Sequence, residues 1–198
     1  EANRVDQSIA LVARTLHAPL PAIGTLAEVK SNRMLAEMGF LLGMGDQRLA
    51  TIVDAARAAG YLQAPLARSG SLSLNGLLQG FIDLVVEVDG AYWILDYKTN
   101  RLGDTAGAYG PDALAGAISA SHYDLQYLLY TVALHRHLRS CLDDYDPDRH
   151  LGGVQYLFVR AMDGQTGAGV FVDRPDIRLV EALDALFDAE AADRDATA

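Results

Sequence analysis

The sequence predicts a mixed α+β fold with an antiparallel pair of strands at its centre, and three observations support this prediction. Two strand-like runs, Phe81–Val88 and Ala91–Lys98, flank Asp89-Gly90, which is a favoured two-residue turn of a β-hairpin. Helical spacing of apolar residues follows over about 123–141 and again near the C-terminal end. Between these helices, an apolar run at 154–159 is short enough for a buried strand. We therefore expect a mixed central sheet flanked by helices.

The N-terminal part of the chain has the weakest pattern. Up to about residue 35 the apolar residues follow only a weak helical period, which Pro19 and Pro21 interrupt. Residues 1–30 are therefore expected to be a truncated, weakly organised segment ahead of one domain over residues 31–198. Within that domain, the short apolar run at 37–42 predicts a strand. Asp46 can cap a helix that reaches about residue 59 and stops at Gly60.

The remaining elements lie on either side of the hairpin. Residues 61–79 are rich in turn-forming residues, among them Pro65, Gly70 and Gly76, and residues 103–116 are expected to be a loop. A helix over about 123–141 and a strand at 154–159 follow. A loop that contains several glycines then leads to a short strand at 170–172. Pro175 stands where a last helix can begin.

Composition restricts the possible classes of protein. The chain has 198 residues, of which 51% are apolar and 21% charged, so it has enough material for a packed core and is not expected to be disordered. No apolar run reaches about 18 residues and no secretory leader is present, so we expect no membrane association. The single cysteine, Cys141, cannot form an internal disulfide and suits a reducing compartment. The expected protein is soluble and cytoplasmic.

The charge balance argues against a protein that binds nucleic acid through its own surface. The chain has 16 Lys and Arg residues and 26 Asp and Glu residues, which gives a formal net charge of −10. A free-standing DNA-binding domain needs a basic stripe that neutralises phosphates. Any DNA or RNA on which this chain acts would therefore be delivered by a partner or held locally. A catalytic module inside a larger assembly remains compatible with the charge.

The predicted hairpin brings two carboxylates together at its open end. If Asp89-Gly90 is the turn, Leu84 lies opposite Leu95 and Asp83 lies opposite Asp96. One face is then apolar and is expected to face the core; it consists of Leu84, Val86, Val88, Trp93 and Leu95. Opposed side chains lie about 4.5–5.5 Å apart at Cβ, so two carboxylates there repel each other unless a cation lies between them. Hard oxygen ligands at such a spacing suit Mg²⁺.

Lys98 adds an amine to the same face of the hairpin. It stands two residues beyond Asp96, and side chains alternate along a strand with a period of two. Two carboxylates and an ammonium group suit metal-assisted hydrolysis of a phosphodiester, because the carboxylates hold the ion and the ammonium orients water or stabilises developing charge. The alternative interpretation is a solvated strand face, since a bare Asp-x-Lys triplet is common.

Several segments carry a resemblance to a known family. The first two are Gly80-Phe81-Ile82-Asp83-Leu84-Val85 and Leu95-Asp96-Tyr97-Lys98-Thr99-Asn100-Arg101-Leu102-Gly103. Downstream of them lie Tyr123-Asp124-Leu125-Gln126-Tyr127, Leu129-Tyr130-Thr131-Val132-Ala133-Leu134-His135-Arg136, Gly152-Gly153-Val154 and Tyr156-Leu157-Phe158-Val159-Arg160. Over roughly residues 30–190 they resemble the family of C-terminal nuclease domains of RecB, a subunit of the bacterial RecBCD helicase–nuclease. The resemblance implies a PD-(D/E)xK nuclease domain with a restriction-endonuclease-like core over residues 31–198.

The resemblance implies roles for residues of the hairpin. Asp83 and Asp96 would be the metal-binding carboxylates, and Lys98 would be the catalytic lysine. The backbone carbonyl of Tyr97 would be a further ligand, and the implied cofactor is one or two Mg²⁺ ions. Glu37 occupies a position where the family has an acidic residue at the entry to a strand, so it is an accessory candidate or a structural residue.

Two further catalytic residues follow from the resemblance. Gln126 and Tyr130 match the Gln-x-x-x-Tyr motif of the family. Their spacing of four residues places both on one face of a helix, which suits a pair that points at the scissile strand. The alternative is an ordinary buried polar pair.

One ligand of the family has no counterpart in this sequence. The family also uses a histidine from an upstream helix, in a Gly-x-x-x-His context. The nearest run is Ala13-Arg14-Thr15-Leu16-His17, which has alanine in place of the glycine and is followed by Ala18-Pro19. The other histidines follow the catalytic strands and are expected to be ordinary ones: His122, His135, His137 and His150. We therefore expect the sequence to begin after that ligand.

Three functions are compatible with these observations. The first is a Mg²⁺-dependent deoxyribonuclease that cuts single-stranded DNA delivered by a helicase in double-strand-break repair, with RecC, RecD and the remainder of RecB as partners. The second, also implied by the resemblance, is a module that docks the recombinase RecA. The third is another nuclease branch, AddB-like or CRISPR-associated, but those branches usually carry an iron–sulfur cluster, which a single cysteine cannot hold.

Overall fold

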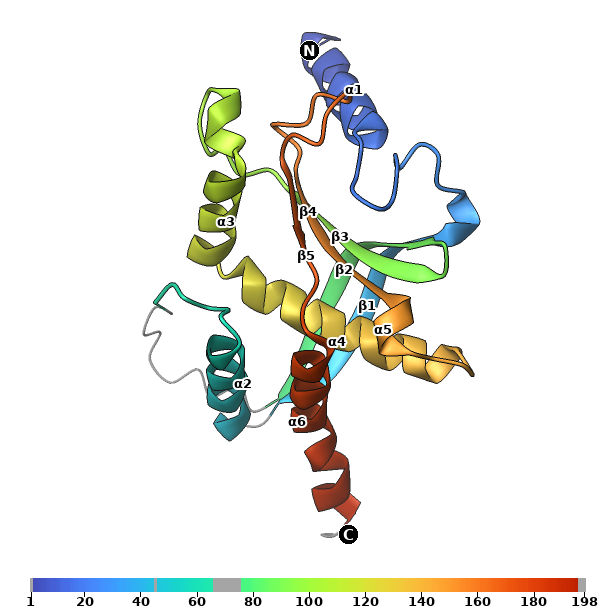
Figure 1. Cartoon of the computed structure of the whole chain (residues 1–198), viewed down its shortest axis with the longest axis vertical. Coiled ribbons are helices and arrows are strands. Elements are labelled where there is room, and N and C mark those ends of the chain that lie inside the picture. Colours follow the sequence, from blue (N-terminus) through green and yellow to red (C-terminus); the bar gives the residue numbers. More distant parts are fainter. Residues whose placement is uncertain (1, 45, 66–75, 196–198) are drawn as a thin grey trace. The chain divides into compact units, whose positions relative to one another are not determined.

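The computed structural model describes residues 2–44, 46–65 and 76–195 (Figure 1). Its helices are α1 (Ala2–His17), α2 (Asp46–Ala58), α3 (Pro111–Ala120), α4 (Tyr123–Cys141), α5 (Pro147–His150) and α6 (Ile177–Asp195). Its strands are β1 (Met34–Met44), β2 (Gly76–Val88), β3 (Ala91–Lys98), β4 (Leu151–Phe158) and β5 (Val170–Asp173). Short 3-10 helices occupy Ser31–Arg33 and Ala106–Tyr109. Among the described residues, no helix is both long and apolar enough to cross a membrane.

The strands form one five-stranded sheet in the order β1-β2-β3-β4-β5. Strands β2 and β3 pair antiparallel, as do β4 and β5. The mixed α+β class expected from the sequence is confirmed.

The chain divides into two compact units. The first unit consists of Glu1–Met38, Asp83–Ala117 and Gly152–Arg174. The second consists of Gly39–Ile82, Ile118–Leu151 and Pro175–Ala198. The first unit therefore continues past the boundary that the sequence suggests at residue 30.

The hairpin of β2 and β3 has the predicted turn and register. Asp89 and Gly90 both have positive φ, at 52° and 82°, as a type I′ turn requires. Leu84 pairs with Leu95, and the pairing continues residue by residue, without a bulge, to Val88 opposite Ala91. This turn fixes which side chains share a face, because a shift by one residue would move every side chain to the other face.

The core of the first unit lies on the predicted apolar face of the hairpin. Its fully buried members come from the segment after α1, from the hairpin and from β4 with the residues that follow it: Ala18, Leu20, Ile23, Leu26, Leu84, Val86, Leu95, Leu157, Val159 and Met162. Leu11 of α1, Val88 and Trp93 pack against this core and are partly buried. Residue 152 must be a glycine for Trp93 to pack as it does, because a Cβ at Gly152 would lie 2.5 Å from the indole ring.

In the second unit, helix α6 packs against α2 and α4. The beginning of α4 is tied to the segment after α2, since the backbone N–H of Leu62 donates to Oδ2 of the buried Asp124 at 2.7 Å. Tyr61 and Tyr127 add an edge-to-face contact with ring centroids 6.0 Å apart. These contacts hold α4 at its N-terminal end.

Four stretches differ from the expected pattern. Residues 2–17 form the helix α1, and the segment after it contributes to the core of the first unit. Strand β2 begins at Gly76, inside the stretch expected to be turns, while the other expected turn residues at 66–75 lie outside the described residues. The expected loop at 103–116 contains the start of α3, which has Pro111 at its first position. The short helix α5 was not expected.

Candidate active site

The three residues expected to carry the chemistry lie in the first unit, on the open end of the hairpin. Asp83 belongs to β2, and Asp96 and Lys98 belong to β3. Asp96 and Lys98 share the face opposite the core face, because they alternate with the core residue Leu95. The same face carries Val85 and Ile94, both buried, so an apolar floor adjoins the charged groups.

Lys98 and Asp96 form a buried ion pair. The ammonium Nζ of Lys98 lies 2.6 Å from Oδ2 of Asp96, and the two residues are only 8% and 3% exposed. Burial raises the pKa of the Asp96 carboxyl, the bond from Lys98 lowers it, and the charge of Asp83 raises it further. The pKa of this carboxyl is therefore above its ordinary value even with an ammonium group in contact.

Asp83 is oriented by the backbone of the opposite strand. Its Oδ2 accepts a hydrogen bond from the backbone N–H of Tyr97 at 2.9 Å. Asp83 is partly exposed, whereas Asp96 is almost fully buried. Because Tyr97 lies between Asp96 and Lys98 in the chain, this bond holds the Asp83 carboxylate beside the buried pair.

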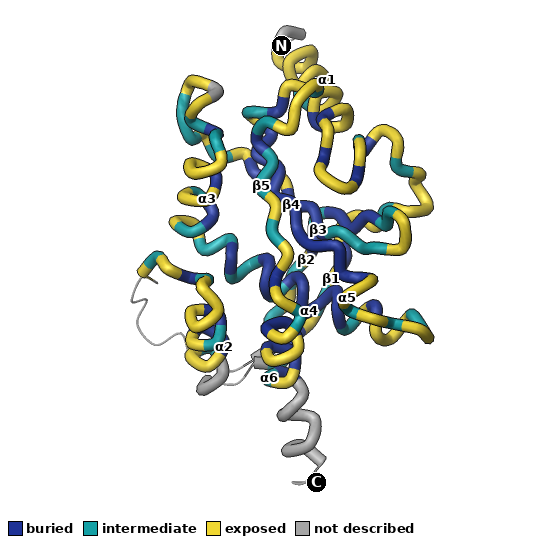
Figure 2. Tube along the Cα trace, in the orientation of Figure 1, coloured by how far each residue is buried: buried dark blue, intermediate teal, exposed yellow. Residues whose placement is uncertain are grey.

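Tyr156 supports Lys98 and was not expected from the sequence. The Nζ of Lys98 lies 4.8 Å from the centre of the Tyr156 ring, which is within the range of a cation–π contact. Tyr156 is fully buried on β4, a strand that is buried along its whole length (Figure 2). The signal in the sequence was an aromatic residue inside a mostly apolar strand, and nothing there indicated its neighbour.

The residues present fit a divalent cation that prefers oxygen ligands. Asp83 and Asp96 supply carboxylate oxygens, and the effect of Asp83 on the pKa of Asp96 means that their charges interact. Magnesium commonly keeps several waters and binds through one or two carboxylates together with phosphates of the substrate. Among the described residues, no group of three or more His, Cys, Asp or Glu side chains could hold a metal ion. The donor set that the described residues offer here is thus the two carboxylates of Asp83 and Asp96.

Gln126 and Tyr130 lie in the second unit, as a bonded pair on α4. The Nε2 of Gln126 donates to Oη of Tyr130 at 2.9 Å, so both side chains lie on one face of the helix as their spacing predicts. Phe40 contacts the Tyr130 ring edge to face, with centroids 5.6 Å apart. Tyr130 is 8% exposed and Gln126 is partly exposed. The catalytic role of the pair stays a prediction.

Four of the five histidines are exposed or packed against an aromatic ring, whereas His122 has a positive φ of 53° and a buried Nδ1 with no hydrogen-bond partner among the described residues. His17 is exposed at the end of α1, and His137 is exposed on α4. His135 and His150 are buried in the second unit, where both contact the Tyr145 ring. Glu37 is exposed on β1 with a positive φ of 51°.

The fold and this arrangement of acidic residues and lysine agree with a comparison against protein families. The model of the PD-(D/E)XK nuclease superfamily matches residues 4–196. The chain therefore belongs to the PD-(D/E)XK nuclease superfamily, a group of metal-dependent nucleases.

Within this superfamily the chain is similar to RecB subunits of RecBCD enzymes. It is 39% identical to that of Escherichia coli (strain K12) over 179 residues, which cover 89% of this chain and 15% of the relative. It is 46% identical to that of Mycobacterium tuberculosis (strain CDC 1551 / Oshkosh) over 165 residues, covering 78% of this chain and 14% of the relative. The recognition of a RecB-type nuclease domain from the sequence motifs is confirmed, and the chain spans less than a sixth of these relatives.

Proposed function

We propose that this chain hydrolyses phosphodiester bonds of single-stranded DNA with Mg²⁺ as cofactor. The observation that carries the proposal is the buried contact of Lys98 with Asp96, next to the carboxylate of Asp83. A buried carboxylate with a raised pKa, in contact with a buried lysine, is frequent at catalytic sites. Membership of the nuclease superfamily gives the reaction class.

Each residue of the proposed site has a distinct task. Asp83 and Asp96 would hold one or two Mg²⁺ ions together with the Tyr97 carbonyl. The chemistry that such an ion supplies is polarisation of the phosphate and acidification of a water. Lys98, held by Asp96 and by the Tyr156 ring, presents its Nζ protons toward the water or toward negative charge that develops on the phosphate.

Gln126 and Tyr130 would act on the substrate strand. The Gln126 amide and the Tyr130 hydroxyl are both groups that can donate hydrogen bonds. Both groups suit contact with phosphate oxygens. The pair would therefore position the strand rather than take part in proton transfer.

The larger assembly is the expected source of the substrate. By analogy with the RecB subunits named above, we propose that the chain works with RecC, RecD and the remainder of RecB on DNA that a helicase has unwound in double-strand-break repair. The net charge of −10 supports delivery of the strand, because such a surface attracts DNA poorly by itself.

Cleavage of end-labelled single-stranded DNA tests the proposal. The chain is expected to degrade the strand when Mg²⁺ is present, weakly without its partners, and Asp96→Ala is expected to remove this activity. Asp104→Asn is the matched control, because the Asp104 side chain is 76% exposed and paired only with Arg101 among the described residues. Undiminished cleavage by the Asp96→Ala protein would refute the assignment.

Docking of RecA is the second function expected from the resemblance, and it is compatible with the first. A pull-down with Asp96→Ala protein separates docking from cleavage. Retention of RecA would support docking, and its complete absence from the bound fraction would remove this candidate.

A further inference from the structure

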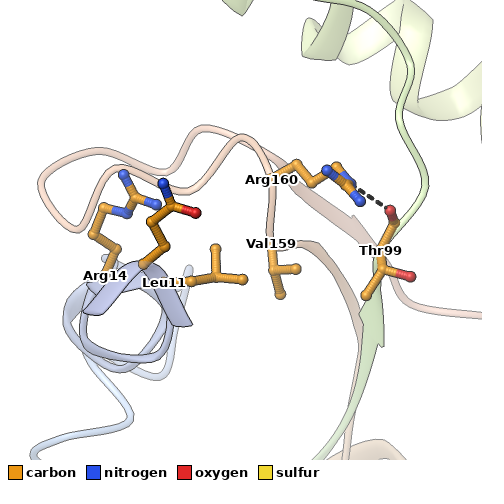
Figure 3. A pocket seen from close by; sticks show the side chains of 6 residues that line it. Leu11, Arg14, Thr99, Val159 and Arg160 are labelled. Carbon is orange, nitrogen blue, oxygen red and sulfur yellow. Dashed lines mark hydrogen bonds between the residues drawn. The ribbon is translucent and has the colours of Figure 1, made fainter. Parts of the chain in front are cut away.

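A pocket with two arginines lies in the first unit where strand β3 ends (Figure 3). Its volume is about 360 Å³. The residues that line it come from α1, from the end of β3 and from the end of β4: Gln7, Leu11, Arg14, Thr99, Val159 and Arg160. Figure 3 shows Arg14 on the helix and Arg160 across the pocket from it, with Leu11 and Val159 between them.

Neither arginine is neutralised by a carboxylate within the part of the chain that the structure describes. Other exposed arginines are neutralised in this way, for example Arg101 by Asp104 and Arg178 by Asp176. Arg160 uses its Nε–H to bond the backbone oxygen of Thr99 at 2.7 Å. A guanidinium has five N–H donors, so most of those of Arg160 remain for a ligand.

The pocket is built by close packing around α1. Leu11 packs against the core of the first unit, which fixes the face of α1 that borders the pocket. Gly164, in the loop between β4 and β5, lies so near α1 that a Cβ there would be 3.2 Å from Cα of Arg14. Its φ of 77° is also one that glycine adopts easily. The backbone of α1 at Arg14 is therefore packed closely against this loop, and no carboxylate of the described residues pairs with the Arg14 side chain.

The pocket borders the proposed catalytic strand. The backbone N–H of Val159 donates to the carbonyl oxygen of Lys98 at 3.1 Å, and Arg160 follows directly in the chain. The side chain of Val159 lies in the core, whereas that of Lys98 lies on the other face of the sheet. The pocket of the two arginines thus lies beside the end of β3.

We infer that the Arg14–Arg160 pocket binds the sugar–phosphate backbone of the DNA strand at a position away from the scissile phosphate. This inference rests on the proposed nuclease function. Guanidinium groups bind phosphate oxygens in forked pairs, and the apolar wall of Leu11 and Val159 suits a deoxyribose. In a chain with a net charge of −10, such a site supplies local positive charge for binding phosphate. The pocket affects binding of the strand and not the chemical step.

The salt dependence of binding tests this inference. The probe is a fluorescein-labelled oligothymidine of about 16 nucleotides, long enough for a single-strand site. Its dissociation constant is measured by fluorescence anisotropy in EDTA, between about 50 and about 200 mM NaCl. The variants are Arg14→Gln, Arg160→Gln and Arg160→Lys. The control is Lys30→Gln, which removes one charge from an exposed position of the same unit outside the pocket. Circular dichroism checks that each variant is folded.

Loss of one phosphate contact has a defined signature. Arg14→Gln and Arg160→Gln are each expected to weaken binding about tenfold. Each should also lower the slope of log K against log salt by about 0.7, while Lys30→Gln leaves it unchanged. Arg160→Lys should keep the slope but bind more weakly than the parent protein, because it keeps the charge and loses the fork.

Two negative outcomes have different meanings. If the parent chain cleaves DNA while the Arg14→Gln and Arg160→Gln slopes equal that of Lys30→Gln, the pocket does not bind phosphate and the proposed function still stands. If the parent chain cleaves no DNA with Mg²⁺, the proposed function fails and this inference fails with it.

Discussion

The Nζ of Lys98 lies 2.6 Å from Oδ2 of Asp96, on a strand face where both residues are almost fully buried. Removing two charges from water costs free energy that their mutual attraction does not always recover. A hydrophobic pair of the same volume would serve the fold equally well. The presence of this buried ion pair beside a second carboxylate therefore favours a chemical role.

Replacement of the lysine tests that role. Lys98→Gln is expected to lower DNA cleavage by about a hundredfold or more, because a donor to the developing charge is lost. Single-turnover assays with saturating enzyme measure the chemical step directly. Lys30→Gln serves as the charge-matched control and should cleave like the parent protein. Equal single-turnover rates for Lys98→Gln and the parent protein would show that the ammonium is structural.

The aromatic ring beneath Lys98 gives a second prediction. Tyr156→Leu removes the ring face that the ammonium contacts, whereas Tyr156→Phe keeps it. A desolvated cation–π contact contributes about 2 kcal/mol, so we expect the leucine variant to cleave at least about tenfold more slowly than the phenylalanine variant. Thermal denaturation of both proteins separates this effect from unfolding. Equal rates for the two variants would mean that the ring does not position the lysine.

The bonded pair on α4 gives a third prediction. Tyr130→Phe removes the hydroxyl that accepts from Gln126 and keeps the ring contact with Phe40, so the free energy of unfolding should fall by only about 1 kcal/mol. If the pair positions the strand, cleavage should fall by a larger factor than this stability change explains. Gln63→Ala, an exposed glutamine of the same unit, is the control. Unchanged cleavage by both Tyr130→Phe and Gln126→Ala would leave only the structural interpretation.

His135 makes the stability of the second unit depend on pH. Burial lowers the pKa of His135, and this effect exceeds the opposite effect of Asp184, whose Oδ2 lies 3.7 Å from Nε2. Arg139 and Arg136 also lower the pKa, while Glu181 raises it. The imidazole is therefore favoured in its neutral form, with Nδ1 bonded to Oη of Tyr145 at 2.9 Å.

The sign of the pH effect follows from this lowered pKa. The unfolded chain takes up a proton near pH 6.5, before the folded one does, so the free energy of unfolding should fall as pH drops below about 6.5. Urea denaturation at several pH values measures it. His135→Gln is expected to lose less stability in this window than the parent protein. The control is His137→Gln, which changes an exposed histidine of the same helix and should behave like the parent protein. Identical dependence of the free energy of unfolding on pH for the parent protein and both variants would contradict the prediction.

The hairpin was predictable from the sequence because its rules are local. Asp89-Gly90 fixes the turn, the turn fixes the register, and the period of two then assigns Leu84 and Leu95 to the core. The same rules place Asp96 and Lys98 on the opposite face. Helix α4 was equally predictable from its spacing of apolar residues, with the same bounds as expected.

Other features depend on contacts between distant segments. Helix α3 is different, because its alanines and the proline at its first position are local helix signals that the expectation of a loop did not use. The Tyr156 ring under Lys98 and the pocket of Arg14 and Arg160 join residues from separate parts of the chain. Spacing along the sequence contains no information about such neighbours.

Calorimetric titration with Mg²⁺ tests the central claim, that two carboxylates at the open end of the hairpin share a divalent ion. Asp83→Asn removes one charge while its amide oxygen can still accept from the Tyr97 backbone, and Asp104→Asn removes an exposed charge of the same unit. Saturable binding is expected for the parent protein and for Asp104→Asn, and its loss is expected for Asp83→Asn. An isotherm of Asp83→Asn that matches the parent isotherm would contradict the account.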